Sequence, residues 1–499
     1  MPCQAQLLRS MRGIVSNIWR TNRRMPFYLL TVAGIIVRLL WVVCIPNEPV
    51  SDFAGYHLLA SNIYHHQGYS ISGNPVAFQG VGCPFLLGWF FRLIGSTSVF
   101  CGKMFNLLFS SITLPLFCGL SLNLFKEKRL AVAFYAMVVF LPNYIAYTGV
   151  LGTETIALFL FALVLFMQMQ MEESFFKYVL LGLGCGILGL IKPFFLAYPL
   201  LAAAALWIKE KKLKKTLARL TISFIAMCLV IAPWTLRNYR VYKLFIPVSY
   251  NAGYMLMVNN NSANSNGMWM PLAEVPLPEE LENRLEDLDI SYDDFQKHPD
   301  EYAIEDPRID SALQAEAGKW IASHPIAFIK LGLMRIQATF FSAENAGDIY
   351  SWAINSGRVW GDWLVQATQS PGIQFFLKIY LMVLSLAGLF FVLLQVGPAA
   401  RMLFFKDVSI PYRVSVPLLN LFFFTAVPFL FEGQPRYAFL MLFVLVFCFL
   451  EIFPSAINGC ARVWSIWQQA AGRWIESTIR AMTPPGNATK RKAPNSIGN

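Results

Sequence analysis

Charged side chains are scarce in this sequence. Asp, Glu, Lys and Arg make up 14% of its 499 residues and 56% are hydrophobic, whereas about a quarter of an ordinary soluble protein is charged. Composition alone does not separate a membrane protein from a very apolar soluble one, so the length of the apolar runs decides. Spanning a bilayer takes roughly 20 residues of helix. Several runs qualify, including Met25–Ile45 and Phe375–Val396, so we predict an all-α polytopic membrane protein.

The sequence also lacks the common signatures of nucleotide, metal and thiol chemistry. The sequence has nine cysteines, but no two of them form a Cys-x-x-Cys motif. Neither a P-loop nor a Gly-x-Ser-x-Gly motif occurs. His57, His65 and His66 lie near Asp52, but no two histidines have the spacing of one helix face, which favours surface histidines over a metal site. We expect no cofactor and no metal site, although a divalent metal is not excluded.

Basic residues are distributed unevenly between the two sides of the predicted membrane domain. We predict ten spans, at about 25–46, 100–124, 131–147, 155–171, 176–191, 194–208, 217–233, 375–396, 414–431 and 437–453. Lys and Arg strongly outnumber the acids in the segments on the side of both termini, and acids outnumber them on the other side. The overall net charge of +11 therefore indicates positive-inside topology with cytoplasmic termini, not a nucleic-acid partner.

The spans divide the chain into five parts. These are a basic tail at 1–24, a transmembrane catalytic module at 25–233 with its first outer loop at 46–99, an extracytoplasmic segment at 234–374, C-terminal spans at 375–453, and an amphipathic helix with a tail at 454–499. Two half-apolar stretches, 84–94 and 326–341, are expected to lie in the membrane surface. The break at Lys192-Pro193 predicts a helical hairpin with an outward tip, because a single helix would put the following lysines outside.

Asp52 is the first candidate for chemistry. It follows the first span by about seven residues, and Tyr56 and His57 lie about one helical turn further on, so a short helix would present all three together. A carboxylate there can take a proton from an attacking hydroxyl or amine. The alternative is a helix cap, since Asp is a favoured N-cap residue, and the residue alone favours that alternative.

The other candidates also lie at span ends on the acidic side. Glu154 precedes the fourth span, where it can be catalytic or can merely complement the helix dipole. Arg237, next to Asn238, can grip a phosphate with its two-pronged guanidinium, and Lys192 and Arg436-Tyr437 repeat that situation. The alternative for each cation is snorkelling to anchor a helix end.

The order of these motifs resembles the polytopic GT-C glycosyltransferases, and most closely glycosyltransferase family 39, which includes protein O-mannosyltransferases and the lipid A aminoarabinose transferase. The matching residues are Asp52, Tyr56, Ala60, Gly68-Tyr69, Pro84, Gly149–Glu154, Ile191-Lys192-Pro193, Pro233–Tyr239, Pro247-Val248-Ser249, Asn251–Gly253, Asn259–Asn261 and Arg436-Tyr437. The resemblance covers roughly 25–260 and 320–440. Ser51-Asp52 departs from the two adjacent acids of many relatives, and Gly82-Cys83-Pro84 departs from their Tyr-Pro pair.

The resemblance implies a GT-C fold and an inverting sugar transfer outside the bacterial plasma membrane. The implied donor is a polyprenyl-phosphate sugar and the acceptor a lipid, glycan or protein. Asp52 would be the base and Glu154 would shape the cavity or orient the acceptor. Arg237, with Lys192 and Arg436 as weaker candidates, would stabilise the leaving phosphate, and Tyr56, His57, Asn238 and Tyr437 would bind substrate. One alternative is a transporter or lipid flippase, which needs ionisable residues in mid-membrane; only Arg38 is a candidate for such a residue. The other alternative is a scaffold protein.

Overall fold

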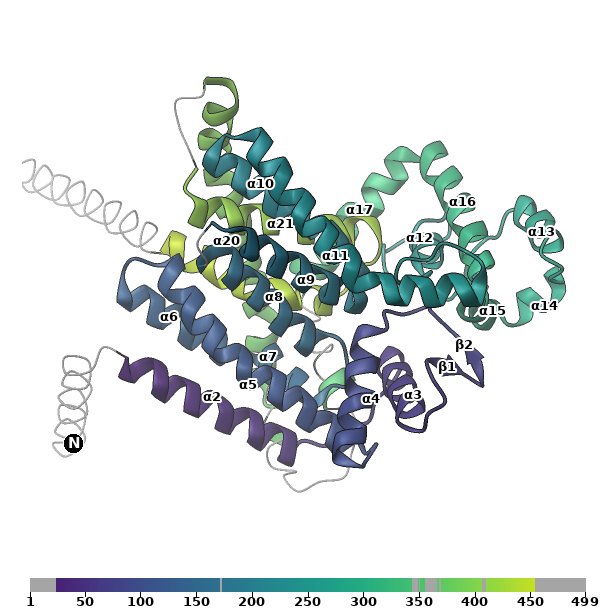
Figure 1. Ribbon diagram of the computed structural model, residues 1–499, viewed down its shortest axis with the longest axis horizontal. Coiled ribbons are helices and arrows are strands. Elements are labelled where there is room, and N and C mark those ends of the chain that lie inside the picture. The colour runs from purple at the N-terminus through teal and green to yellow at the C-terminus, as the bar shows by residue number, and fades with distance from the viewer. Residues whose placement is uncertain are drawn as a thin grey trace, which may run out of the picture. The chain divides into compact units, whose positions relative to one another are not determined.

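The computed structural model describes residues 24–170, 173–342, 349, 351–354, 366–367, 369–405 and 410–453. The chain divides into two compact units, Met1–Phe449 and Leu450–Asn499, and the arrangement described below belongs to the first (Figure 1). The described part is helical apart from one two-stranded hairpin, which confirms the predicted all-α fold. The predicted amphipathic helix and tail at 454–499, and all but the last residue of the basic tail, lie outside the described residues.

Each of the ten predicted spans is helical in the structure. They correspond to α2 (Met25–Cys44), α5 (Val99–Leu124), α6 (Lys128–Val139) with α7 (Pro142–Ala146) and η1 (Tyr147–Gly149), α8 (Glu154–Gln170), α9 (Phe175–Ile191), α10 (Tyr198–Glu210), α11 (Leu213–Tyr242), α20 (Pro371–Ala400) with η4 (Arg401–Phe405), α21 (Tyr412–Leu430), and η5 (Pro435–Met441) continuing as a helix over 442–453. In the described part of the chain, six helices are long and apolar enough to cross a membrane. The bent pair that begins with α6 makes a seventh candidate span. The protein is therefore a polytopic membrane protein, with α8, α9 and α10 shorter than a full span.

Prolines set two of the breaks between these helices. The residue before a proline is biased away from helical geometry, and the chain bends by 48° where Leu141-Pro142 separates α6 from α7. Lys192 has extended backbone angles, ends α9, and is followed by η2 (Pro193–Ala197) and α10. The predicted break at Lys192-Pro193 is thus confirmed.

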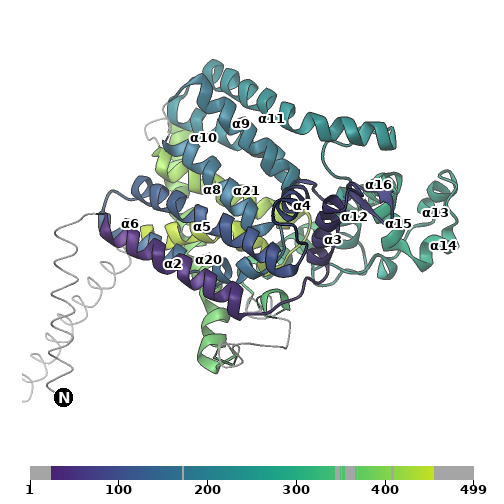
Figure 2. The same cartoon turned by 60° about the horizontal axis from the view of Figure 1, so that its bottom comes forward.

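Small residues allow α9 and α11 to pack closely. A Cβ atom at Gly182 would lie 2.2 Å from the Ser223 carbonyl oxygen, and one at Gly186 would lie 2.7 Å from Cβ of Val230. Glycines four residues apart on one helix face permit such backbone approach in membrane helices. Figure 2 shows α11 running beside α9 and α10 and reaching toward the outer helices.

Arg38, the candidate charge within the first span, is buried and fully engaged by neighbouring helices. Its Nε donates to Ser110 Oγ at 2.8 Å, and its Nη1 donates to the carbonyl oxygens of Gly34 and Val139 at 3.1 and 2.9 Å. These contacts join α2 to α5 and α6. Arg38 therefore pins three membrane helices together, which is a structural use of a charge within a span.

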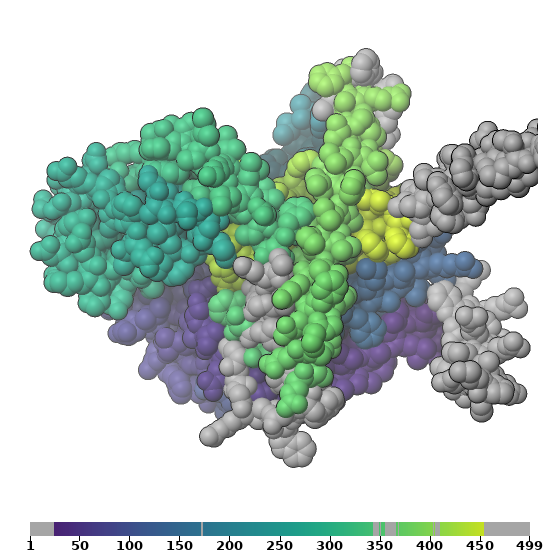
Figure 3. All heavy atoms as spheres, turned by 180° about the vertical axis from the view of Figure 1, so that it is seen from behind, coloured from purple at the N-terminus to yellow at the C-terminus, as the bar shows by residue number. Residues whose placement is uncertain are grey.

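The segments between the membrane helices form a helical layer at one end of the bundle, which we call the outer layer. It contains α3 (Asp52–Tyr64), β1 (Ser70–Ile71), β2 (Asn74–Pro75), α4 (Gly82–Ile94), α12 (Ala252–Asn259), η3 (Leu272–Glu274), α13 (Glu279–Glu286), α14 (Tyr292–Lys297), α15 (Pro299–Glu305), α16 (Pro307–Ser323) and α17 (Pro325–Phe340). Helices α12 to α16 enclose an apolar core of their own and form a distinct lobe in Figure 3. The predicted helices at 84–94 and 326–341 are present as α4 and α17, and their place in the membrane surface stays a prediction.

Candidate active site

Asp52 begins α3 and is held by an arginine from the far end of the chain. Its Oδ2 accepts a hydrogen bond from Nη2 of Arg436 at 3.0 Å. The preceding Ser51 has φ 52° and ψ −132°, a backbone conformation that L side chains rarely adopt, and it makes no side-chain cap. Since the helix begins at Asp52 and the carboxylate pairs with Arg436, the geometry does not favour the helix-cap alternative.

Arg436 lies in η5 and is surrounded by aromatic rings. Its guanidinium carbon is 5.7 Å from the ring centroid of Phe53, 5.6 Å from that of Trp352 and 5.2 Å from that of Tyr437. Nη2 also donates to the Tyr437 hydroxyl at 3.3 Å. Its Nε, however, is buried and has no hydrogen-bond partner among the described residues. A buried donor without a partner is costly, so Arg436 is held in place without all of its hydrogen bonds being satisfied by the described residues.

Glu154 and Lys192 form a second ion pair beside the first. Lys192 Nζ lies 3.3 Å from Oε1 of Glu154, and both side chains are largely buried. The other oxygen, Oε2, is buried without a hydrogen-bond partner among the described residues. A Cβ at Gly152 would lie 2.4 Å from this oxygen and 2.6 Å from Phe53, so glycine is needed where the start of α8 meets α3.

A cavity joins the two ion pairs. It has about 350 Å³ of space free of protein atoms, counting its open mouth. Its lining residues are Glu154, Lys192, Phe194, Phe424, Val427, Pro428, Arg436, Tyr437, Phe439 and Leu440. The cavity thus combines two cations, one carboxylate and an apolar wall at the ends of α8, α9 and α21, which suits an anionic group attached to an apolar chain.

Glu432 and Tyr437 extend the polar network away from the cavity. The Tyr437 hydroxyl donates to Oε2 of Glu432 at 2.5 Å, and Nε2 of Gln434 donates to Oε1. Burial raises the pKa of Glu432 above its ordinary value, and the nearby Arg436 opposes this shift. The sequence analysis did not select Glu432 as a site residue. Its place in the same short loop as Arg436-Tyr437 could have indicated it.

The structure separates Tyr56 from His57. Burial, together with the nearby carboxylates of Asp52 and Glu154, raises the pKa of Tyr56 well above its ordinary value, so its hydroxyl lies near both acids. His57 instead donates from Nε2 to the Thr97 carbonyl oxygen at 2.7 Å, and its ring packs against Phe91. The prediction that one helix turn presents all three side chains together therefore fits Asp52 and Tyr56, while His57 lies on the face that packs against α4.

Arg237 and Asn238 hold the outer loop between α3 and α4. Arg237 donates to the carbonyl oxygens of Val76 and Tyr69 at 3.0 and 3.2 Å, and its guanidinium lies 4.7 Å from the ring of Trp234. Asn238 is buried and donates to the Ile246 carbonyl at 3.0 Å. Neither residue lines the cavity, so the structure gives both a role in shaping the loop.

Arg335 is another residue that the sequence analysis did not single out. It is buried in α17, where its Nη1 donates to the Phe431 carbonyl at 2.9 Å and its Nη2 to Oδ1 of Asn260 at 2.8 Å. A Cβ at Gly433 would lie 2.5 Å from the Arg335 backbone. Arg335 therefore ties the end of α12 and helix α17 to the loop that carries Glu432 and Arg436.

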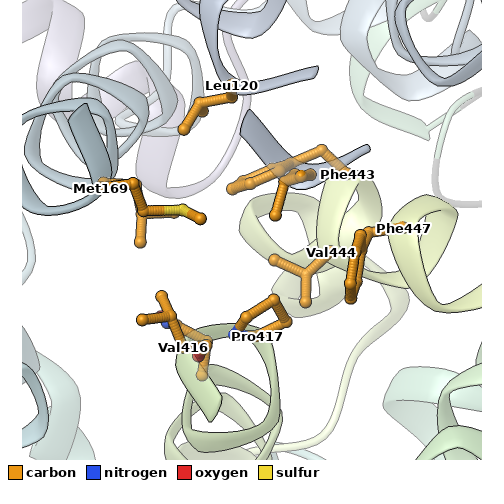
Figure 4. Close-up of a pocket in the computed structure, with 10 residues that line it drawn as sticks. Leu120, Met169, Val416, Pro417, Phe443, Val444 and Phe447 are labelled. Carbon is orange, nitrogen blue, oxygen red and sulfur yellow. The ribbon is translucent and has the colours of Figure 1, made fainter. Parts of the chain in front are cut away.

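A second cavity, between α5, α8, α21 and the helix at 442–453, has a different character. Figure 4 shows Leu120, Met169, Val416 and Phe443 around it, and its lining is almost entirely apolar. Among the described residues, no group of three or more His, Cys, Asp and Glu side chains could hold a metal ion. Of these two cavities, only the first is therefore lined by charged side chains.

Comparison with known proteins finds similarity to solved structures only. No family model matches the chain, and no curated protein matches it. The oligosaccharyltransferase of Archaeoglobus fulgidus, tethered to an acceptor peptide, matches with TM-score 0.47 and 12% identity over 91% of this chain and 52% of that chain. The same protein with an inhibitory peptide and a dolichol-phosphate matches with TM-score 0.46 and 12% identity over 89% and 52%. This chain spans about half the length of those it matches.

Proposed function

We propose that this protein is a GT-C type membrane glycosyltransferase that moves a sugar from a polyprenyl-phosphate donor to a lipid, glycan or protein acceptor. The observation that carries the proposal is the cavity in which Lys192 and Arg436 meet an apolar wall directly beside Asp52. Cations at a developing phosphate charge stabilise a transition state in a site from which water is largely excluded. The resemblance of the sequence to glycosyltransferase family 39 agrees with this chemistry.

The residues divide the reaction between them. The phosphate of the donor sits between Lys192 and Arg436, and its prenyl chain follows the Phe194, Phe424 and Val427 side of the cavity. An acceptor hydroxyl or amine attacks the anomeric carbon from the opposite side and gives its proton to Asp52. The bond from that carbon to the phosphate oxygen breaks, and its electron pair stays on the phosphate, so the anomeric centre inverts.

This assignment moves the phosphate role from Arg237 to Lys192 and Arg436. Arg237 is engaged by the Tyr69 and Val76 carbonyls, whereas Arg436 lines the cavity and has a buried Nε without a hydrogen-bond partner among the described residues. Glu154 lines the same cavity and has a buried oxygen without a hydrogen-bond partner among the described residues, and it orients the sugar or the acceptor through a hydrogen bond. A transporter or flippase is less well supported, because Arg38 is committed to helix packing.

Substitution of Asp52 by asparagine tests the proposal. Asparagine keeps the size and the hydrogen-bonding reach but does not act as a general base, whose contribution is typically about 10²–10⁴-fold in rate. We expect a loss of that order in sugar transfer by purified protein with unchanged expression and melting temperature. A rate within a few-fold of wild type would reject the catalytic role of Asp52.

Asp306→Asn is the matched control. Asp306 also stands at a helix start and pairs with an arginine, Arg308, at 2.6 Å, and it caps α16 through the Arg308 N–H. Because asparagine caps a helix about as well as aspartate, this variant should keep both its stability and its transfer rate.

A further inference from the structure

Arg436 stands between two different environments. On one side is Asp52, whose side chain is 42% exposed, and on the other is the cavity lined by Glu154 and Lys192. The Arg436 side chain itself is only 9% exposed. One guanidinium therefore connects the solvent-accessible carboxylate with the enclosed space that we assign to the donor phosphate.

The hydrogen-bond donors of Arg436 are used unequally. Nη2 donates to Asp52, while Nε is buried without a partner among the described residues. The rings of Phe53, Trp352 and Tyr437 surround the group, and the carboxylates of Glu432 and Glu154 also lie near it. In such an apolar setting an electrostatic contact is stronger than in water, so an anion entering the cavity competes effectively for this guanidinium.

One oxygen of Asp52 is committed to Arg436. Oδ2 accepts the hydrogen bond from Nη2 at 3.0 Å, so the proton of an acceptor reaches that oxygen only after the pair has separated. An event that draws Arg436 away would free Oδ2 for the acceptor.

We propose that the donor phosphate is this event, so that Arg436 is a latch that releases Asp52 only when the donor occupies the cavity. The inference rests on the proposed function and adds its regulation. Arg436 then acts on the leaving phosphate directly and on the acceptor through Asp52. Donor binding must precede productive acceptor binding, which prevents Asp52 from activating an acceptor or water beside an empty cavity.

Thermodynamic reciprocity provides a test that does not depend on catalysis. If a phosphate in the cavity weakens the Asp52–Arg436 pair, that pair weakens phosphate binding by the same factor. Removing the charge of Asp52 should therefore tighten phosphate binding, even though the same change abolishes the base. Equilibrium binding of farnesyl phosphate to the purified full-length protein measures this directly.

We expect Asp52→Asn to bind farnesyl phosphate about 5- to 100-fold more tightly than wild type, a range typical of coupled sites. Asp52→Glu keeps a competing carboxylate and should bind as wild type does. In an Arg436→Gln background the effect of Asp52→Asn should disappear, since the two residues no longer interact. If the tighter binding came from relief of simple charge repulsion between Asp52 and the ligand, it would persist in the Arg436→Gln background. That result would overturn the latch.

The outcomes separate the latch from the proposed function. Binding by wild type that Asp52→Asn leaves unchanged or weakens would refute the latch and leave the donor cavity in place. Absence of farnesyl phosphate binding in wild type and in Asp52→Asn would refute the cavity assignment, and the latch with it. If Arg436→Gln does not fold, the Asp52→Asn protein still tests the latch, because binding of farnesyl phosphate no tighter than that of wild type refutes it.

Discussion

Arg237 and Arg436 have the same chemistry and different surroundings. Arg237 lies on α11, beyond the apolar part of that helix. Two of its N–H groups donate to carbonyl oxygens of the loop between α3 and α4. Arg436 follows α21, is surrounded by aromatic rings, lines the cavity, and has a buried Nε without a hydrogen-bond partner among the described residues. One arginine thus fixes a loop while the other faces the space where a ligand fits.

At this scale we expect Arg237→Ala to act mainly on stability. The loss of hydrogen bonds from a charged group to the Tyr69 and Val76 carbonyls should cost on the order of 2 kcal/mol and lower both the melting temperature and the transfer rate. Arg237→Lys should restore the melting temperature only in part, because an ammonium does not reach two carbonyls as a planar fork does.

The control for Arg237 is Arg240→Ala on the same helix, since Arg240 is exposed and this change removes the same charge. It should leave the melting temperature unchanged. A large rise in donor KM for Arg237→Ala at an unchanged melting temperature would contradict the structural role and return the phosphate role to Arg237.

Single residues at helix ends were predictable, and their partners were not. The positions of Asp52, Glu154, Lys192 and Arg436 at span ends followed from the apolar runs alone. The pairing of Asp52 with Arg436 joins residues 384 positions apart, and no local pattern encodes such a contact. His57 was assigned to the site because helical spacing alone does not tell which face of a short helix packs against its neighbour.

Helices α12 and α16 meet at a buried carboxylate. The backbone N–H of Tyr254 donates to Oδ1 of Asp310 at 2.8 Å, and a Cβ at Gly253 would lie 1.9 Å from the Asp310 carbonyl oxygen. Burial raises the pKa of Asp310 from 3.8 to about 6. The close contact between these two helices therefore places an ionisable group where ionisation is unfavourable.

This contact predicts a pH-dependent stability of the outer lobe. A carboxyl whose pKa is higher in the folded state stabilises that state fully at low pH, and the contribution is lost as the pH rises through about 6. We expect the free energy of unfolding of the lobe to fall by on the order of 2–3 kcal/mol between pH 4 and pH 8. Fluorescence of Trp269, which donates to the Tyr254 hydroxyl, can follow the transition.

Asp310→Asn should remove most of this pH dependence, because an amide accepts the same hydrogen bond without ionising. The exposed Asp293 of α14 supplies the control, and Asp293→Asn should retain the wild-type slope. An Asp310→Asn protein with an unaltered pH profile would show that other groups dominate.

The helices themselves were largely predictable, because apolar run length, proline breaks and basic flanks are local signals. What remained hidden was the internal arrangement of the outer layer. Helices α13 to α15 are acidic and short, and the apolar core that they share with α16 depends on Leu281, Phe295 and Leu313, which come together only in three dimensions. The contacts of Arg335 were equally hidden. Arg335 joins α17 to backbone carbonyl groups, and every residue has such a group, so the sequence does not reveal the partner.

For the whole molecule, the orientation in the membrane is the decisive property. A membrane-impermeant thiol reagent applied to intact cells should label a cysteine at Glu286 in α13, and should label one at Lys214 in α11 only after the membrane is opened. Both positions are exposed. The described native cysteines are buried or partly buried, and the unsubstituted protein gives the background. The opposite labelling pattern would contradict transfer on the outer face.

Helix α11 has 30 residues, which at about 1.5 Å per residue makes it roughly 45 Å long. The hydrocarbon core of a bilayer is only about 30 Å thick, so this helix, which contains Pro233, is longer than the core by several turns. Its projecting part carries Arg237, which grips the loop between α3 and α4, and thereby fixes how far that loop stands from the lipid. The length of α11 therefore sets the distance between the membrane and this loop. A bilayer of another thickness is expected to shift the height of Asp52 relative to the lipid headgroups, so the sugar transfer that we propose should vary with the host membrane.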